Sequence, residues 1–230
     1  MSSPIAKKTK GTLEQWVIQS HQKLSHNKRI NYLSALFVQI LNQLPLEKNI
    51  RLLDIGCGDM SIAENIMANK EGVQATCLDT YPLPEELKGE VRWNKYVAFD
   101  GRTIPFEAAK FDVAILCDVL HHDFEYAQRL VQEACRVAQY VLIKDHFEYG
   151  MISRQKLRLM DFVGNWGYGV SIPDRYFSQN SYQQLLEQVD AVQEIERICP
   201  IPLYQHNLVF NTIFPGKLQF ISVLECQEND

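Results

Sequence analysis

Five aspartates stand at the ends of the apolar runs in the first two-thirds of the sequence: Asp54, Asp79, Asp100, Asp118 and Asp145. Parallel strands end at one edge of a sheet, where ligands bind in α/β folds, so these side chains are expected to share one rim. Independent capping of strand ends would not readily place an acid at all five positions. The series therefore predicts a site for a positively charged ligand.

The first of these acids opens a glycine turn, Asp54-Ile55-Gly56-Cys57-Gly58. Glycines let the backbone approach a ligand where any Cβ would collide. A helix is expected from Ser61, with Ser61-x-x-Glu64 as a capping box, so its free N–H groups and positive dipole end face the turn. Ser61 stands where a dinucleotide fingerprint requires its third glycine, and Asp54 would repel a diphosphate. The unit therefore favours a mononucleotide ligand that carries a positive charge.

Asp79 follows the second strand-like run and lies 21 residues after Gly58. In nucleotide-binding folds, an acid about 20 residues beyond the glycine turn binds the ribose hydroxyls. A carboxylate can accept both hydroxyl hydrogen bonds of a diol. The alternative is an ordinary aspartate that caps a turn at the end of its strand. The spacing favours the ribose role.

The acid-x-Gly-x-Gly pattern resembles motif I of the class I S-adenosylmethionine (SAM) methyltransferases. Phe99-Asp100-Gly101 is similar to the adenine-side motif of that family, and the run from Phe111 to His122 is similar to its small-molecule branch. The resemblance covers residues 51–146. One departure is Met60, where the family often has a third glycine, so its side chain either narrows the pocket or points away. The resemblance implies a SAM cofactor surrounded by Asp54, Gly56, Cys57, Gly58, Asp79, Thr80, Asp100, Gly101, Cys117 and Asp118.

Methyl transfer from a sulfonium is an in-line displacement, so the protein must align the acceptor and remove its proton where needed. Histidine titrates nearest neutral pH and is the natural base. His122 and His146 follow the fourth and fifth predicted strands and are the candidate bases, with Asp145 as the neighbouring catalytic candidate. His121 is expected to pack at a helix start.

An alternative assigns Asp118, Asp145 and His146 to a metal ion. The catechol-type O-methyltransferases hold magnesium at the corresponding positions, with an asparagine where this chain has His146. Magnesium prefers oxygen ligands, whereas manganese, iron or zinc accepts a histidine. The primary expectation is therefore a site without a metal.

The acceptor is expected to be a small molecule, and nucleic acid is an unlikely target. In the family that this chain resembles, Asn-Pro-Pro-Tyr or Asp-Pro-Pro-Tyr after the fourth strand marks enzymes that methylate planar amide or adenine nitrogens, and this chain has neither motif. Enzymes that methylate C5 of cytosine use a Pro-Cys or Thr-Cys nucleophile, and Cys117 is not part of such a pair. The net charge of −5 also disfavours a polyanion. A flat or apolar molecule would suit the aromatic residues of a later loop, which are Trp166, Tyr168, Tyr176 and Phe177.

Two other functions stay open. The chain could be a non-catalytic SAM-binding module that contacts a protein partner through its first 44 residues. It could also be a nucleotide-sugar or NAD enzyme of Rossmann type, although Asp54 and Ser61 disfavour that reading.

Strand-like runs alternate with helical patterns through five cycles, which predicts a doubly wound, mostly parallel α/β sheet with helices on both faces. Seven strands are expected, at 51–53, 73–78, 91–97, 111–117, 140–144, 192–198 and 218–224. The resemblance to the methyltransferase family implies that the last two are antiparallel at the sheet edge. Helices are expected at 12–26, 28–44, 152–163 and 181–189, besides those after Ser61 and His122. We expect a flexible tail at 1–11 and a single methyltransferase domain at 12–230, including an N-terminal helical cap at 12–46 and a substrate-side insertion at 147–180.

The composition fits a globular protein of 230 residues, in which no apolar run approaches the roughly 20 residues of a membrane span. The basic N-terminus lacks the apolar core of a signal peptide. The six cysteines are scattered, which predicts buried free thiols in a reducing compartment, hence a cytoplasmic location. A homodimer is compatible with the sequence. The cysteines stand at 57, 77, 117, 135, 199 and 226.

Overall fold

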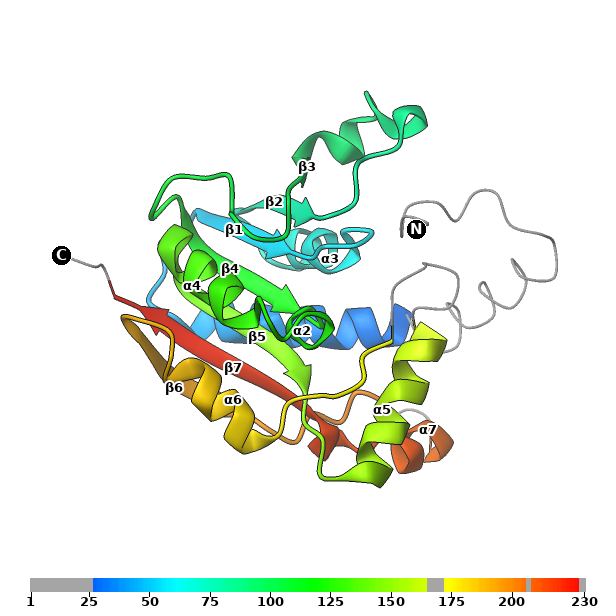
Figure 1. Ribbon diagram of the computed structural model, residues 1–230. Coiled ribbons are helices and arrows are strands. Elements are labelled where there is room, and N and C mark those ends of the chain that lie inside the picture. The colour runs from blue at the N-terminus through cyan, green and yellow to red at the C-terminus, as the bar shows by residue number, and fades with distance from the viewer. Residues whose placement is uncertain (1–26, 165–171, 206–207, 228–230) are drawn as a thin grey trace.

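A computed structural model describes residues 27–164, 172–205 and 208–227, which form one seven-stranded sheet with helices on both faces (Figure 1). The helix expected at 12–26 and the aromatic residues Trp166 and Tyr168 lie outside the described residues. The strands are β1 (Ile50–Ile55), β2 (Val73–Asp79), β3 (Tyr96–Ala98), β4 (Phe111–Cys117), β5 (Ala138–His146), β6 (Val192–Ile198) and β7 (Gln219–Cys226).

The strand order across the sheet is β3-β2-β1-β4-β5-β7-β6. Strands β1 to β5 pair in parallel, and β7 runs antiparallel to both β5 and β6. The predicted mostly parallel sheet with an antiparallel edge is therefore confirmed. Because the strand order reverses between β1 and β4, ligands of such sheets bind at the carboxyl ends of these strands.

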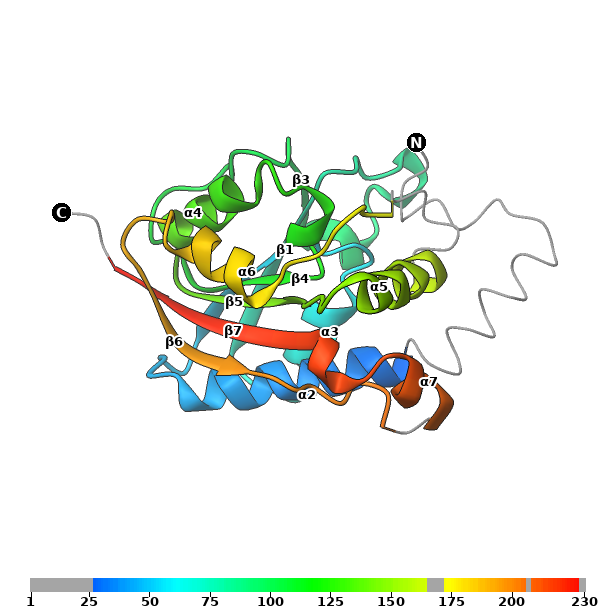
Figure 2. The ribbon, with the colours of Figure 1, turned by 60° about the horizontal axis from the view of Figure 1, so that its bottom comes forward.

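Helices pack on both faces of the sheet. They are α2 (Asn27–Gln43), α3 (Ser61–Asn69), α4 (Ala127–Val137), α5 (Met151–Gly164), α6 (Gln179–Leu186) and α7 (Leu208–Ile213). Side chains alternate along β1, so that Leu53 and Ile55 pack with residues of α4 and α6, whereas Ile50 and Leu52 pack with residues of α2 and α5. Figure 2 shows α4 and α6 on one face of the sheet and α2 on the other. Four short 3-10 segments complete the connections, namely η3 (Glu85–Leu87), η4 (Val91–Lys95), η5 (Leu120–His122) and η6 (Gly216–Leu218).

Three predicted boundaries are wrong. The run 91–97 is a strand only from Tyr96, because its first part forms η4, with Val91 in solvent and Trp93 buried. Helix α6 starts before residue 181, because Ser178 and the side chain at Ser181 form a capping box. Strand β5 continues to His146, because β7 pairs with it through its last residue. Helix α7, six residues long, was not predicted, since so short a segment shows no periodicity.

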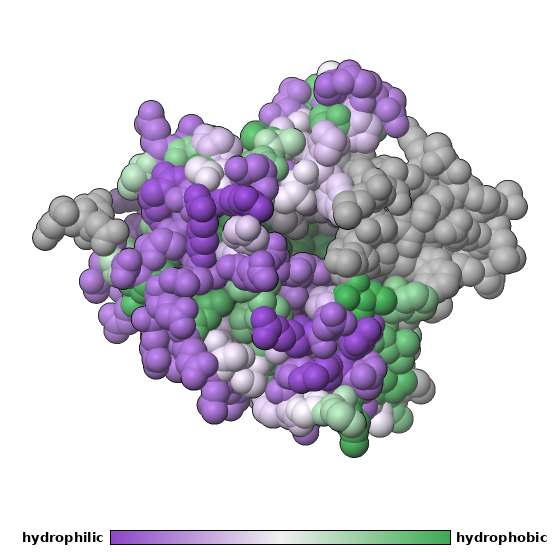
Figure 3. Space-filling model, in the orientation of Figure 1, coloured by the Kyte–Doolittle hydropathy of each residue, from purple (hydrophilic) through white to green (hydrophobic). Residues whose placement is uncertain are grey.

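Helix α5 carries apolar residues on two sides. Leu157 and Met160 are buried, whereas Ile152 and Leu159 are exposed, and hydrophobic residues gather over α5 and α7 at the surface (Figure 3). Among the described helices, none combines the length and the apolar character needed to span a bilayer.

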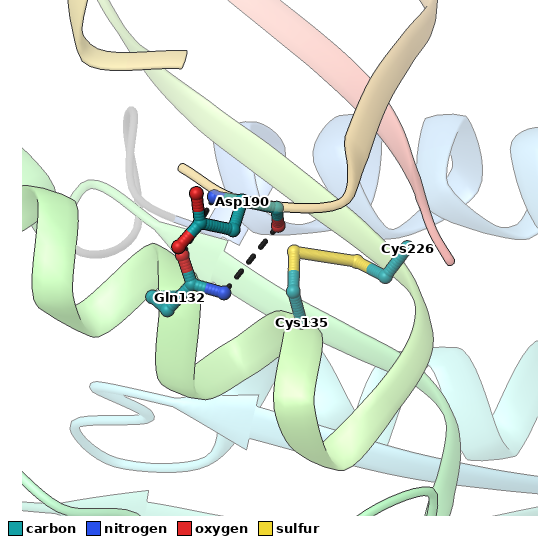
Figure 4. The surroundings of a disulfide bond; sticks show 4 residues. All are labelled: Gln132, Cys135, Asp190 and Cys226. Carbon is teal, nitrogen blue, oxygen red and sulfur yellow. Dashed lines mark hydrogen bonds between the residues drawn. A yellow bond between two sulfur atoms is a disulfide. The ribbon is translucent and has the colours of Figure 1, made fainter. Parts of the chain in front are cut away.

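The prediction of free thiols is wrong for two of the six cysteines. Cys135 on α4 and Cys226 at the end of β7 form a disulfide, with their Cα atoms 5.2 Å apart (Figure 4). The two are 91 residues apart, so only the packing of α4 beside β7 could reveal the pair. Gln132 strengthens this junction by accepting the backbone N–H of Asp190 over 2.8 Å. The cytoplasmic location was expected because the six cysteines were predicted to be free thiols, and this disulfide contradicts that prediction for two of them.

Reduction of this disulfide is expected to lower thermal stability. A crosslink that closes a loop of this length contributes about 2–4 kcal/mol, mainly by restricting the unfolded chain. Dithiothreitol should therefore lower Tm by roughly 5–15 °C in differential scanning calorimetry. The double variant Cys135→Ser/Cys226→Ser is the control, because its Tm should not respond to the reductant. An equal response of the double variant would contradict the prediction.

Candidate active site

The glycine turn after β1 is tied to the end of β2. The backbone N–H groups of Gly56 and Cys57 donate to the carbonyl of Leu78 over 2.8 and 3.0 Å. Gly56 has φ +72°, and a Cβ there would lie 2.5 Å from Cγ2 of Val119, so any other residue would strain the backbone and displace Val119. At Gly58, with φ +54°, no described atom lies within 4 Å of that Cβ position. The turn thus packs against the segment after β4 and borders open space at Gly58.

Met60 takes the left-handed conformation, φ +64°, at the N-cap of α3. Its side chain is fully buried and packs with Cys77, Trp93 and Tyr96. Of the two alternatives for Met60, this packing favours a side chain that points away from the ligand rim. A glycine would adopt the same backbone at lower cost but would leave a cavity in this cluster.

The predicted capping box at the start of α3 does not form. The N-cap is Met60, and the backbone N–H of Ser61 donates to Oδ1 of Asp59 over 3.1 Å. Glu64 instead pairs with the guanidinium of Arg92, which follows η3 in the chain. Glu64 pairs with Arg92 and not with the backbone of the helix start, because the guanidinium donates two hydrogen bonds to its carboxylate.

Asp54 near the end of β1 is 2% exposed, and its Oδ2 has no hydrogen-bond partner among the described residues. Burial, followed by the nearby carboxylates of Asp79 and Asp59, raises the pKa of Asp54 to about 7. A buried carboxylate in this state is stabilised by any positive group that reaches it. The predicted preference for a cationic ligand at Asp54 is therefore consistent with its surroundings.

Asp79 is the last residue of β2, and Asp100 lies in the turn after the neighbouring parallel strand β3. Asp79 accepts the backbone N–H of Gly58 over 2.8 Å, and burial raises the pKa of its carboxyl. Asp100 is exposed, and its Oδ1 accepts two backbone N–H groups of its own turn at 2.8 Å, which lower the pKa of its carboxyl. A Cβ on Gly101 would lie 3.0 Å from Cγ2 of Thr80, so the two turns touch. The acids after β2 and β3 thus share one side of the sheet edge.

Asp118, after β4, is the centre of a charge cluster. Its carboxylate pairs with Nζ of the fully buried Lys144 on β5 and with the guanidinium of Arg29 on α2. Its Oδ1 also lies 3.1 Å from Nε2 of His146. Burial acts to raise the pKa of Asp118, but these cations outweigh it and hold the pKa well below the usual range. Asp118 itself has φ +58°, a strained backbone for this residue type.

His121 is not a residue that merely packs at a helix start, which corrects the expectation. It is 1% exposed in η5, and its Nδ1 lies 2.6 Å from Oδ1 of the fully buried Asp145. Its Nε2 lies 3.5 Å from Oδ2 of Asp161 on α5, a carboxylate that also accepts the hydroxyl of Tyr176. Burial alone would lower the pKa of His121, but the two carboxylates raise it to about 9. The imidazole is therefore charged at neutral pH.

His122 and His146 flank His121. The ring centroid of the half-buried His122 lies 4.3 Å from the ring centroid of His121, and the ring centroid of His146 lies 5.0 Å from that of His121. Burial and then the ammonium of Lys144 hold the pKa of His146 well below its usual value. His146 is thus a neutral imidazole beside a charged one.

Stability is expected to fall as the pH rises through about 9. The folded-state pKa of His121 is raised above the unfolded value of 6.5, so its contribution is complete below pH 6.5 and disappears above 9. This difference corresponds to at most about 3 kcal/mol. Urea unfolding at pH 6.5 and 9.5 measures it, and the His121→Gln variant should show a smaller loss over this interval. An identical loss in both proteins would contradict the prediction.

The predicted residues form two groups at the carboxyl edge of the sheet. Around β1, β2 and β3 lie the glycine turn and the acids Asp54, Asp79 and Asp100, and at the ends of β4 and β5 lie the three histidines with Asp118 and Asp145. Sequence reasoning missed Arg29, Lys144 and Asp161. Lys144 and Asp161 each interrupt an apolar pattern, which could have marked them, whereas Arg29 carries no such signal. Tyr176 and Phe177, expected to line a pocket, are buried.

Known proteins resemble this chain in sequence family and in fold. Residues 53–140 match the family described as a methyltransferase domain. A chain from the complex between the Haloferax volcanii Trm112 methyltransferase activator and a proposed methyltransferase has a TM-score of 0.64 at 12% identity, over 96% of this chain and 100% of that one. The match to 1,6-didemethyltoxoflavin-N1-methyltransferase of Burkholderia thailandensis has a TM-score of 0.58 at 15% identity, over 97% and 93% of the chains.

A SAM-dependent methyltransferase from Aquifex aeolicus gives a TM-score of 0.53 at 15% identity, over 82% of this chain and 88% of that one. No curated protein matches the chain significantly in sequence. The fold is therefore the Rossmann-like fold of class I SAM-dependent methyltransferases. The segment that matches the methyltransferase-domain family, residues 53–140, contains the glycine turn and β4.

Proposed function

We propose that this protein transfers the methyl group of SAM to an oxygen or nitrogen of a small-molecule acceptor. The observation that carries the proposal is the buried carboxylate of Asp54, which has an oxygen without a described partner and stands beside the glycine turn. A buried charge without a partner is costly, and the ammonium of SAM would offset that cost. The fold shared with SAM-dependent methyltransferases supports the same conclusion.

The residues of the rim fit this cofactor. Asp54 would take its ammonium, Asp79 its ribose hydroxyls and Asp100 its adenine amine, with the second oxygen of Asp100 left for that contact. Gly58 borders open space where the cofactor backbone could approach. When bound, SAM supplies an already activated methyl group. We propose that the lining is completed by Gly56, Cys57, Thr80, Gly101, Cys117 and Asp118.

A rim histidine is proposed to remove the proton of the acceptor. His146 suits this role because its lowered pKa keeps the ring neutral at pH 7, with Nε2 directed at Asp118. His122 is the second candidate, because it is partly exposed and adjoins the cluster. Asp145 would act by positioning His121, and not by contacting the acceptor.

A neutral acceptor fits the charges of the site best. Arg29 and Lys144 share the carboxylate of Asp118, and His121 faces Asp145 and Asp161. The cations of the cluster are thus all close to carboxylates, which disfavours a polyanion at this place. The described parts of the predicted cap and insertion, α2 and α5, are proposed to border this side, because Arg29 and Asp161 reach the cluster from them.

Two measurements test the proposal. Isothermal titration with SAM and S-adenosylhomocysteine (SAH) should give micromolar dissociation constants, and a methyl-labelled donor should label an acceptor from a pool of neutral metabolites. His122→Ala or His146→Ala should lose turnover while retaining SAH binding. A non-catalytic module would instead bind SAM, label no acceptor and be indifferent to both substitutions. Failure of both ligands to bind would refute the proposal.

The affinity for SAH should rise between pH 6 and pH 8. The pKa of Asp54 is raised to about 7 in the ligand-free protein, first by burial, and an ammonium binds its ionised form. Below pH 7 the carboxyl must lose a proton before binding, which costs up to about tenfold in affinity per pH unit. Titrations at pH 6, 7 and 8 measure the slope, and Asp54→Asn should flatten it. A slope that survives in Asp54→Asn would assign it to another group.

A further inference from the structure

We infer that His121, Asp145 and His146 form a binding site for a divalent first-row transition-metal ion. One ligand atom from each residue lies within 4.8 Å of the other two, and each residue is at most 1% exposed. Two imidazoles and a carboxylate suit ions such as Zn²⁺, Co²⁺ or Fe²⁺ and are a poor set for Mg²⁺. His121 replaces Asp118 of the sequence-based alternative, because Asp118 is held by Lys144 and Arg29.

The outer contacts prepare both histidines for an ion. Nε2 of His146 lies 3.1 Å from Asp118, and Nε2 of His121 lies 3.5 Å from Asp161. Metal-binding histidines direct their second nitrogen at a carboxylate, as His146 does, which places the lone pair on the other nitrogen. Nδ1 of His146 is buried and has no hydrogen-bond partner among the described residues, and Nε2 of His121 makes no hydrogen bond either. Nδ1 of His146 is therefore left for the ion, and Nδ1 of His121 faces the carboxylate of Asp145.

Asp145 supplies the third ligand. Its Oδ1 lies 2.6 Å from Nδ1 of His121, and tetrahedral ligands of an ion with bonds of about 2.1 Å are roughly 3.4 Å apart. The three ligand atoms all lie within 4.8 Å of one another, so side-chain adjustments of about an ångström would gather them around the ion. Backbone N–H groups of His121 and His146 already orient the carboxylate. The ion takes the place of the proton between His121 and Asp145, and this proton leaves to solvent.

The charges also favour a dication. Two carboxylates, those of Asp145 and Asp161, approach the ring of His121. A divalent ion bound to neutral imidazoles balances these two carboxylates. It would join η5 to the end of β5 and hold the histidines of the rim in place. With Nδ1 of His146 bound to the ion, His122 is the histidine left to act as the base.

Titration of the untagged full-length chain with Co²⁺ and Zn²⁺, after removal of metals with EDTA, tests the site. We expect one equivalent of Co²⁺ with the visible spectrum of nitrogen and oxygen ligation, a micromolar or tighter dissociation constant, and release of a proton. Saturating Zn²⁺ should raise Tm by about 5 °C. Binding weaker than millimolar, or a thiolate-to-cobalt absorption band from the free cysteines, would overturn the inference.

Substitutions identify the ligands. His146→Gln and Asp145→Asn should weaken Co²⁺ binding at least 100-fold, and Asp161→Asn should weaken it 10- to 100-fold. Asp174→Asn is the matched control, because the side chain of Asp174 is 96% exposed. This variant should bind Co²⁺ as tightly as the unmodified chain does. If the buried variants do not fold, the proton NMR spectrum of the unmodified protein with bound Co²⁺ tests the ligand set. It should show two strongly shifted exchangeable N–H signals, one from each Nε2, and their absence would refute the ligand set.

Discussion

Asp79→Asn is expected to raise the dissociation constant for SAH about 100-fold while the protein stays folded. A carboxylate that accepts two ribose hydroxyls contributes about 1.5–3 kcal/mol through each charged hydrogen bond, and an amide keeps only one acceptor oxygen. The fold should tolerate the change, because burial already raises the pKa of Asp79 and its ionised form is disfavoured. The amide oxygen can still accept the N–H of Gly58.

Asp112→Asn is the control for this experiment. Asp112 lies near the other end of β4, where its carboxylate pairs with Arg51 far from the rim. The dissociation constant of the Asp112→Asn variant for SAH should stay within about twofold of the unmodified value, since exposed ion pairs contribute little to the stability of the fold. Isothermal titration compares the two variants. Equal affinities in both would mean that Asp79 does not contact the ribose, although SAH could still bind elsewhere on the rim.

Lys144→Met is expected to lower the free energy of unfolding by about 3–5 kcal/mol. Lys144 is fully buried in β5, and its ammonium is paired with Asp118. Removal of one member of a buried ion pair leaves the other charge without sufficient compensation, which is costly. Arg29 and His146 still face Asp118, so the loss should fall toward the lower end of this range. Urea unfolding at pH 7 measures the change.

The double variant Lys144→Met/Asp118→Asn separates the lost pairing from lost packing. Once Asp118 is neutral, the methionine no longer leaves a buried carboxylate behind, so the double variant should be more stable than Lys144→Met alone. A double variant that is less stable than either single variant would show that the two residues act independently. The cluster would then contribute to stability through packing and not through its charges.

Much of the architecture was predictable because it depends on local patterns. The continuous apolar run of β4 and the alternation of strands with helices predicted a parallel sheet, and the structure confirms it. The glycine spacing after β1 likewise marked a turn that only residues without a Cβ can form, at least at Gly56. The errors were at short elements such as η4 and α7, where tertiary contacts outweigh a weak local signal.

The sequence by its own patterns placed acids and histidines along one edge of the sheet, because every parallel strand ends there. The partner of each charged group depended on long-range packing. The pairs His121 with Asp145, Lys144 with Asp118, and Cys135 with Cys226 come from segments that no periodicity connects. A side chain's charge state and partner are decided by what is buried beside it, and burial of this kind exists only after the sheet and helices have come together.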